Sequence, residues 1–282
     1  MFNILICGGY NKREDENFSQ VKEFNVNDLK EYNNLPSMLE ERSNSKAVYL
    51  NGEVYVFDGF SNEGRTKSVE KYSPISKKWI KVTDMPDKRY YFCACAFMNN
   101  VYLFGGFDDK RGYQSSCLEF DAKVVKWKEV AKMNEVRSSV ACAIYEENIV
   151  VSGGIYNAIG LRTVDSYDVF GNVWRPMPNM IEERRIHSLI SVKRKLFAIG
   201  GTFSKTNCEV YDKTSNMFVK LETPSFLLCR VKSVLVGSKI FFFQNGTLSV
   251  LCYDVDIDEW SQEISKAIEN IDYYSTVKVP SY

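Results

Sequence analysis

Four arginines are the most regularly spaced side chains in this sequence that could do chemistry. Arg42, Arg89, Arg137 and Arg184 each stand sixteen residues before the first residue of a strand-ending pair, which is glycine in three cases and Asp58 in one. A planar guanidinium can form two parallel hydrogen bonds with one carboxylate. Arginines repeated in phase therefore favour recognition of carboxylate-bearing peptides.

The same arginines have a second interpretation, because acidic residues lie near them in the sequence. The nearby acids are Glu41, Asp87, Glu135 and Glu183. Ion pairs with these acids would hold loops in place instead of binding a partner. The sequence alone leaves both interpretations open.

Residues that could catalyse a reaction or bind a metal are scarce. The only histidine, His187, lies in a strand-like stretch at 184–189, where a structural role is expected. Cys93 and Cys95 share one face of a strand, but no histidine accompanies them as zinc ligand, and there is no Cys-x-x-Cys pair. The glycine pairs end strands without opening a helix, unlike phosphate-binding loops. We therefore predict no enzyme, no metal and no cofactor.

Composition narrows the class of partner. Thirty-six basic and thirty-six acidic residues cancel, which argues against nucleic acid as a partner. The longest apolar run near the N-terminus, Ile4 to Cys7, is too short for a signal peptide core or a membrane span. Most of the eight cysteines lie in apolar strand runs, which is typical of free thiols in a reducing compartment. We predict a cytoplasmic protein without a membrane partner, with association with the cytoskeleton as an alternative.

The elements that position these residues repeat along the chain. Each copy is a short apolar run that ends in a glycine pair, as in 100–107. The first residues of the six pairs are at 8, 58, 105, 153, 200 and 244, in steps of 50, 47, 48, 47 and 44 residues. The second pair is Asp58-Gly59 and the sixth is the degenerate Gln244-Asn245. Periods of this size indicate a radial or stacked repeat architecture.

Aromatic pairs recur in phase with the glycines. Five copies contain two aromatic residues seven positions apart, and the first copy contains two that are eight apart. These pairs are Tyr72 and Trp79, Phe120 and Trp127, Tyr167 and Trp174, Tyr211 and Phe218, Tyr253 and Trp260, and Phe24 and Tyr32. We expect the rings to fill the core between neighbouring sheets.

Glycine pair, spaced aromatics and period together resemble the kelch repeat over essentially the whole chain. The resemblance implies an all-β fold, a six-bladed kelch β-propeller with four antiparallel strands per blade. It also implies that a C-terminal strand near Tyr274 to Val279 completes the first blade and covers two sheet edges. The predicted single propeller covers residues 1–282, with blades at 1–36 plus 273–280, 37–86, 87–133, 134–180, 181–224 and 225–265.

The strand order of such a blade places the links between blades and the loops after the glycine pairs on one face. These variable loops are Tyr10–Ser19, Phe60–Lys67, Phe107–Ser115, Ile155–Arg162 and Thr202–Thr206. Loops that differ on a repeating scaffold are the usual place for recognition. The candidate partner-binding residues on this face are Arg42, Arg89, Arg137, Arg184, Arg65, Arg111, Arg162, Tyr90, Tyr113 and Tyr156.

The chain looks like the kelch domain of the BTB-kelch (kelch-like) adaptor proteins. This resemblance implies substrate recognition for a cullin-3 ubiquitin ligase, by binding a protein or peptide segment for which acidic character is expected. Cullin-3 would be reached only through BTB and BACK segments that this stretch lacks, so both a fragment and a stand-alone kelch protein stay open. Two alternatives remain, an actin-binding or scaffolding kelch protein and, more remotely, a mutarotase-like kelch enzyme that needs only arginine and carboxylates.

Overall fold

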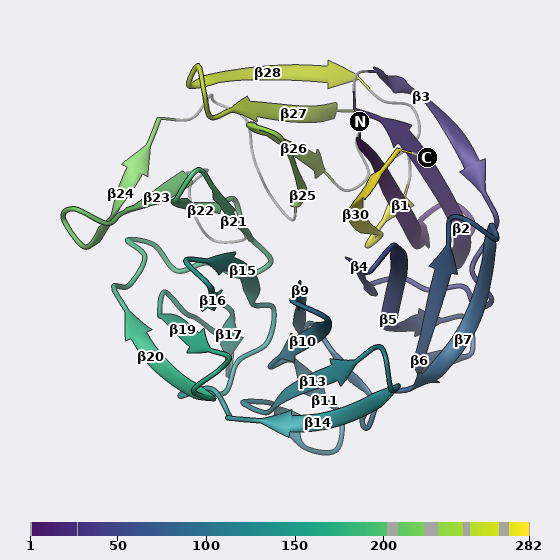
Figure 1. Ribbon diagram of the computed structural model, residues 1–282, viewed down its shortest axis with the longest axis horizontal. Helices are drawn as coiled ribbons and strands as arrows, with labels where there is room; N and C mark the ends of the chain where they lie inside the picture. The colour runs from purple at the N-terminus through teal and green to yellow at the C-terminus, as the bar shows by residue number, and fades with distance from the viewer. Residues whose placement is uncertain are drawn as a thin grey trace. The chain divides into compact units, whose positions relative to one another are not determined.

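A computed structural model describes residues 2–26, 28–201, 208–222, 231–244, 249–264 and 271–281. All regular secondary structure in these ranges is β-strand (Figure 1), which confirms the predicted all-β class. The described residues contain no helix that could span a membrane. The predicted loop Thr202–Thr206 and the second residue of the sixth pair, Asn245, lie outside the described residues.

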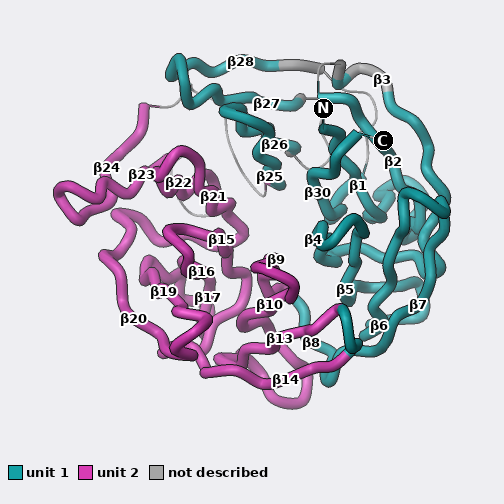
Figure 2. Tube along the Cα trace, viewed as in Figure 1, with its two compact units in different colours: residues 1–90, 123–125, 232–282 teal, residues 91–122, 126–231 magenta. Residues whose placement is uncertain are grey.

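The chain divides into two compact units (Figure 2). Unit 1 comprises Met1–Tyr90, Lys123–Val125 and Lys232–Tyr282, and unit 2 comprises Tyr91–Ala122 and Lys126–Val231. Each unit consists of antiparallel sheets whose strands mostly follow one another in sequence. The blade boundaries and the number of six blades stay predictions.

The described part of unit 1 contains three sheets and a short strand, β8 (Arg89–Tyr90). The first sheet contains β1 (Phe2–Asn11), β2 (Glu16–Asn25) and β3 (Asp28–Leu35), with β29 (Ile271–Asp272) and β30 (Ser275–Pro280) both paired to β1. The second contains β4 (Lys46–Leu50), β5 (Glu53–Ser61), β6 (Gly64–Ser73) and β7 (Lys78–Asp84). The third contains β25 (Val231–Val236), β26 (Lys239–Gln244), β27 (Ser249–Asp254) and β28 (Glu259–Ile264).

The described part of unit 2 contains three four-stranded sheets. The first has the order β14 (Lys126–Val130), β13 (Cys117–Asp121), β10 (Asn100–Phe104) and β9 (Cys93–Phe97). The second contains β15 (Ala141–Tyr145), β16 (Asn148–Ser152), β19 (Val164–Asp168) and β20 (Val173–Met177). The third contains β21 (Ser188–Val192), β22 (Lys195–Ile199), β23 (Cys208–Asp212) and β24 (Met217–Leu221). Short strands follow the glycine pairs of the first two sheets: β11 (Phe107–Asp108), β12 (Gly112–Tyr113), β17 (Ile155–Tyr156) and β18 (Ile159–Gly160).

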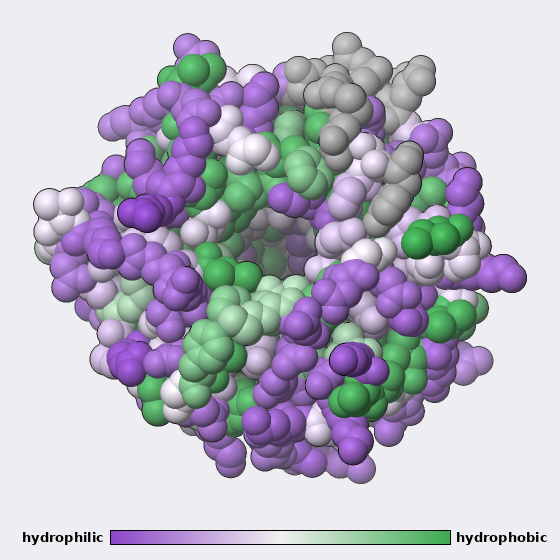
Figure 3. Space-filling model, viewed as in Figure 1, coloured by the Kyte–Doolittle hydropathy of each residue, from purple (hydrophilic) through white to green (hydrophobic). Residues whose placement is uncertain are grey.

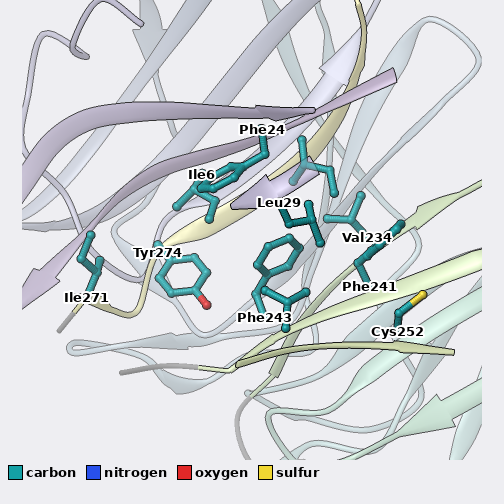
Figure 4. Close-up of a cluster of buried hydrophobic side chains, with 11 residues drawn as sticks. Ile6, Phe24, Leu29, Val234, Phe241, Phe243, Cys252, Ile271 and Tyr274 are labelled. Atoms are coloured by element: carbon teal, nitrogen blue, oxygen red, sulfur yellow. The ribbon is translucent and has the colours of Figure 1, made fainter. Parts of the chain in front are cut away.

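The C-terminal strand closes the first sheet, as the sequence predicts. β30 pairs antiparallel with β1, and Leu5 lies opposite Val277. Beside this pairing, a buried cluster joins the first and third sheets of unit 1, and Figure 4 shows Phe24 and Tyr274 facing Phe243 within it. β30 itself adds Val277 and Val279 to a second buried cluster, so the strand contributes both backbone hydrogen bonds and apolar core to unit 1.

The glycine pairs are required because another backbone segment approaches them closely. In unit 2, Gly105 has φ +64°, and a Cβ atom there would lie 2.4 Å from the backbone oxygen of Arg137. The next residue, Gly106, donates its N–H to that same oxygen at 2.9 Å. Gly153 and Gly154 repeat this arrangement with the backbone oxygen of Arg184. Any larger first residue would push the link that carries the arginine away from the strand.

Two of the predicted loops are longer strand pairs instead. Phe60–Lys67 was expected as a loop, but β5 extends to Ser61 and β6 starts at Gly64. The same holds for Tyr10–Ser19, where β1 and β2 continue towards the turn. In both hairpins the register shifts at the first residue of the pair, so a β-bulge accommodates Gly8 or Asp58 and the ladder continues.

At least one ring of every aromatic pair is buried, as expected, but Tyr32 of the first pair is 39% exposed. Tyr167 and Trp174 lie opposite each other on β19 and β20 with ring centroids 4.9 Å apart. Both rings also contact Phe104 of the preceding sheet, at 5.9 and 5.5 Å. The indole N–H of Trp174 donates to the backbone oxygen of Ala131 at 2.8 Å. The pair therefore joins two neighbouring sheets of unit 2 by both apolar packing and a hydrogen bond.

Candidate functional site

Both phased arginines of unit 2 are enclosed by their own chain. Arg184 is 0% exposed. Its Nη2 and Nε donate to Oε1 of Glu209 at 2.8 and 3.1 Å, and its Nη1 donates to the backbone oxygen of Gly200 at 2.7 Å. Arg137, also 0% exposed, donates from Nη2 to Oδ2 of Asp165 at 2.5 Å. Each guanidinium is held by a carboxylate and by the backbone at the end of a strand.

The phased arginines of unit 1 are buried in a similar way. Arg42 is 0% exposed and donates from Nη2 to Glu70 and to Oγ of Ser68, and from Nη1 to the backbone oxygen of Asp58 at 3.0 Å. Arg89 is 1% exposed and forms a paired contact with Asp87, from Nε at 2.7 Å and from Nη2 at 2.6 Å. Charge-assisted pairs of this kind are strong when they are buried.

The expectation that these four guanidinium groups face a partner does not fit side chains that are at most 1% exposed. The second interpretation, that they hold loops, fits their contacts. Two of the acids expected for it are present, since Arg89 pairs with Asp87 and Arg137 also lies 3.3 Å from Glu135.

The other two expected acids have different neighbours. Glu41 accepts a hydrogen bond from the backbone N–H of Asn62 at 3.4 Å, and Glu183 lies against Gly160. Three buried acids that were not expected from the sequence hold arginines, each on the strand that follows the glycine-pair loop: Glu70, Asp165 and Glu209. An acid about 28 residues after an arginine was the available signal, since Glu70 follows Arg42 and Asp165 follows Arg137 by 28 positions.

The aromatic candidates of unit 2, the half-buried Tyr113 and the exposed Tyr156, form a cluster of rings on two loops. Tyr113 of β12 makes edge contacts with Phe107 of β11, at 5.0 Å, and with Tyr156 of β17, at 5.4 Å. Tyr156 is 41% exposed and lies opposite Ile159 of β18, which is 62% exposed. Asn157 and Ala158, between them, have φ of 48° and 66°.

Two consecutive residues with positive φ make the tight hairpin turn that suits the twist of paired strands. The turn brings Tyr156 and Ile159 next to each other at the tip of the hairpin. We call Tyr113, Tyr156 and Ile159 the aromatic surface of unit 2.

Two exposed arginines stand beside the aromatic surface in the sequence. Arg111 lies in the turn between β11 and β12, and its backbone N–H donates to Oδ1 of Asp108 at 2.9 Å. Arg162 follows β18, and its backbone oxygen accepts a hydrogen bond from Met180 at 2.9 Å. The backbone of both residues is fixed while their side chains are exposed. Both place a positive charge at the surface beside these loops.

The remaining candidates form a separate stack in unit 1. The guanidinium of Arg65 lies 3.6 Å from the ring centre of Tyr90 and 5.0 Å from that of Phe60. The two rings make an edge contact at 5.6 Å. Arg65 is half-buried, and its positive charge interacts with these two rings of its own chain through cation–π contacts.

Single exposed hydrophobic residues elsewhere in unit 2 are weaker candidates for partner contact. Along the outer part of unit 2, where β14 and β20 lie, the surface in Figure 3 is mostly hydrophilic with hydrophobic residues interspersed. Scattered residues of this kind are normal on protein surfaces.

His187 has a structural environment. Its Nε2 lies 2.8 Å from Oγ of Ser152, and burial together with the Arg184 charge lowers its pKa to about 3. Within the described ranges, no three His, Cys, Asp or Glu side chains are grouped so that they could hold a metal ion. The histidine is therefore neutral at physiological pH and belongs to the core of unit 2.

Comparison with known proteins adds a family match. A family model described as the KLHDC2/KLHL20/DRC7 Kelch-repeats domain matches residues 2–201. Kelch-like protein 40 of Xenopus laevis is 30% identical over 167 residues, which are 58% of this chain and 26% of that protein. Kelch-like protein 36 of Bos taurus is 27% identical over 256 residues, 82% of this chain and 41% of that protein. Kelch-like protein 23 of Homo sapiens is 26% identical over 199 residues, 67% of this chain and 33% of that protein. The chain thus spans less than half the length of these relatives.

Proposed function

Because this chain belongs to the kelch-repeat family, whose domains serve protein–protein interaction, we propose that the aromatic surface of unit 2 binds a short segment of a partner protein. The observation that carries the proposal is the contact between Tyr113 and Tyr156 on two separate loops, with Ile159 exposed beside them. Tyrosine combines a large apolar ring with a hydrogen-bonding hydroxyl, and such residues dominate binding energy at interfaces.

The partner segment carries an apolar or aromatic anchor for the rings and acidic residues beside it. Arg111 and Arg162 supply positive charge in the same loops. Charges at the rim of an interface mainly raise the association rate and set specificity, while the anchor sets the dissociation rate. Arg137 donates from Nη1 to the backbone oxygens of Gly153 and Thr163, so it holds the ends of the loop that carries Tyr156 and makes no contact with the segment.

The experiment is a screen of displayed random peptides against the chain, followed by affinity measurement for the selected peptides. We expect enriched peptides with an aromatic or large aliphatic residue near acids, and at least tenfold weaker binding to Tyr156→Ala, which is about 1.4 kcal/mol. Phe170→Ala is the matched control, because Phe170 is an exposed ring of the same unit in the turn between β19 and β20. Equal loss with both variants would reject the aromatic surface as the binding site.

We also propose that the bound segment belongs to a substrate of a cullin-3 ubiquitin ligase. The similarity to Kelch-like proteins over much of this chain supports this proposal. Cullin-3 contact would require BTB and BACK segments in the same protein. In cells, Tyr156→Ala in the full-length protein should lower ubiquitin conjugation of the partner without changing co-purification of cullin-3. An actin scaffold would instead co-sediment with actin filaments and change no conjugation.

A further inference from the structure

Two cysteines of unit 2 lie together between neighbouring sheets, and the proposed binding surface does not use them. Cys95 is on β9 and Cys142 is on β15, strands of two different sheets. Both side chains are half-buried, and both pack against the same hydrophobic cluster.

The alternation of side chains along each strand explains why the two sulfurs meet. Cys93 and Phe97 flank Cys95 on its face of β9 and belong to this cluster, as do residues of the neighbouring sheet. On β15, Ala141 and Ala143 belong to the cluster on the opposite face, so Cys142 points back towards β9. The Cys95 thiol is hydrogen-bonded to Cys142, and that contact and burial raise the pKa of Cys95.

We propose that Cys95 and Cys142 form a site of reversible oxidation, at which a small-molecule disulfide such as oxidised glutathione converts the two thiols into one disulfide bond. Two thiols within hydrogen-bonding reach of each other are close enough for side-chain rotation to bring their sulfurs towards bonding geometry. The bond would covalently join two strands that share no backbone ladder in this sheet order.

The reaction begins at Cys142. Because its hydrogen bond to Cys142 and its burial raise the pKa of Cys95, Cys95 is held as the thiol at the start, and we assign the first nucleophilic thiolate to Cys142. The Cys142 thiolate attacks one sulfur of oxidised glutathione, the glutathione S–S bond breaks, and one glutathione thiolate leaves. The Cys95 thiolate then attacks the Cys142 sulfur of this mixed disulfide and releases the second glutathione. Two protein sulfurs are oxidised, one glutathione disulfide is reduced to two thiols, and the two protein protons pass to them.

The test uses the reduced chain, oxidised glutathione under native conditions, an acid quench, alkylation and digestion with trypsin. The sequence places Cys95 in the peptide 90–110 and Cys142 in the peptide 138–162. We expect these two peptides to be linked, with a mass lower by two hydrogen atoms than their sum, and separated again by dithiothreitol. Cys95→Ser should leave glutathione attached to Cys142, and Cys142→Ser should leave Cys95 unmodified.

Cys93 lies in the same peptide as Cys95 and needs its own control. Cys93→Ser should retain the link, because Cys93 is buried and two positions away on the strand. Peptides that stay unlinked and alkylated on both cysteines after oxidation of the native wild-type chain would overturn the proposal. A link that persists in Cys95→Ser would also overturn it.

Discussion

The single histidine allows a sharp test of the core of unit 2. His187 has a pKa of about 3 in the folded protein, against about 6.5 in an unfolded chain. Because the folded value is lower, the unfolded state binds the extra proton as the pH falls below 6.5. Stability is therefore expected to be fully present above pH 6.5 and to decrease progressively towards pH 3.

The size of the effect follows from the two pKa values. At pH 8 neither state protonates His187, and at pH 5 the unfolded state is almost fully protonated while the folded state remains neutral. The free energy of unfolding should then be about 2 kcal/mol lower at pH 5 than at pH 8 through this residue alone. No other histidine in the chain titrates in this window.

The assay compares urea unfolding of the wild type and His187→Gln at pH 5 and pH 8. The glutamine amide can still reach Oγ of Ser152, which lies 2.8 Å from Nε2 in the wild type. Titrating carboxylates and the N-terminal amine contribute equally to both proteins, so the difference between them isolates His187. The NMR signal of the single imidazole gives the folded pKa directly. Identical pH dependence in the two proteins, or an imidazole that titrates near 6.5, would refute the reasoning.

Three further predictions concern a buried pair, a departure from the repeat and the proposed surface. Glu209→Ala should lower the free energy of unfolding by about 3–5 kcal/mol, because it leaves the fully buried Arg184 charge without its carboxylate; calorimetry and denaturant titration measure this, and a loss below 1 kcal/mol contradicts it. Asp58→Gly should raise stability by about 1 kcal/mol, because Asp58 has φ 55° where the repeat has glycine. Burial raises the pKa of Asp58, so the gain should be larger at pH 7 than at pH 4, and a gain independent of pH would argue against a buried charge. Arg162→Glu should slow association with an acidic peptide at low salt and leave dissociation nearly unchanged, whereas Lys195→Glu, at the start of β22, should change neither rate; stopped-flow fluorescence separates the two rates.

The sequence predicted the fold through residues whose conformation or size is hard to replace. Gly105 and Gly153 mark strand ends because a side chain there would collide with a backbone oxygen. Tyr167 and Trp174 mark the outer strands because their rings fill the space between sheets. Both kinds of landmark reflect local sterics, which a single sequence records well.

The sequence predicted the site less well, because burial of a charge depends on distant residues. The residues around Arg184 in the sequence do not indicate that its side chain is buried. Its partner Glu209 lies 25 positions away on another strand. Ile159 was not among the predicted site residues, because 155–162 was expected to be a variable loop and not a paired hairpin. Asn157 at a hairpin position was the available signal, since asparagine readily adopts the positive φ that it has here.

The pairing of β30 with β1 determines how the first sheet would respond to mechanical force. Phe2 lies opposite Pro280 at one end of the ladder and Cys7 lies opposite Ser275 towards the other. A force that pulls Phe2 and Pro280 apart would break the backbone hydrogen bonds of this pair one after another, starting from that end of the ladder. The hydrogen bonds would not all bear the force at the same time. We therefore expect this strand pair to separate at low force in an optical-tweezers experiment, before the interior strands of the same sheet.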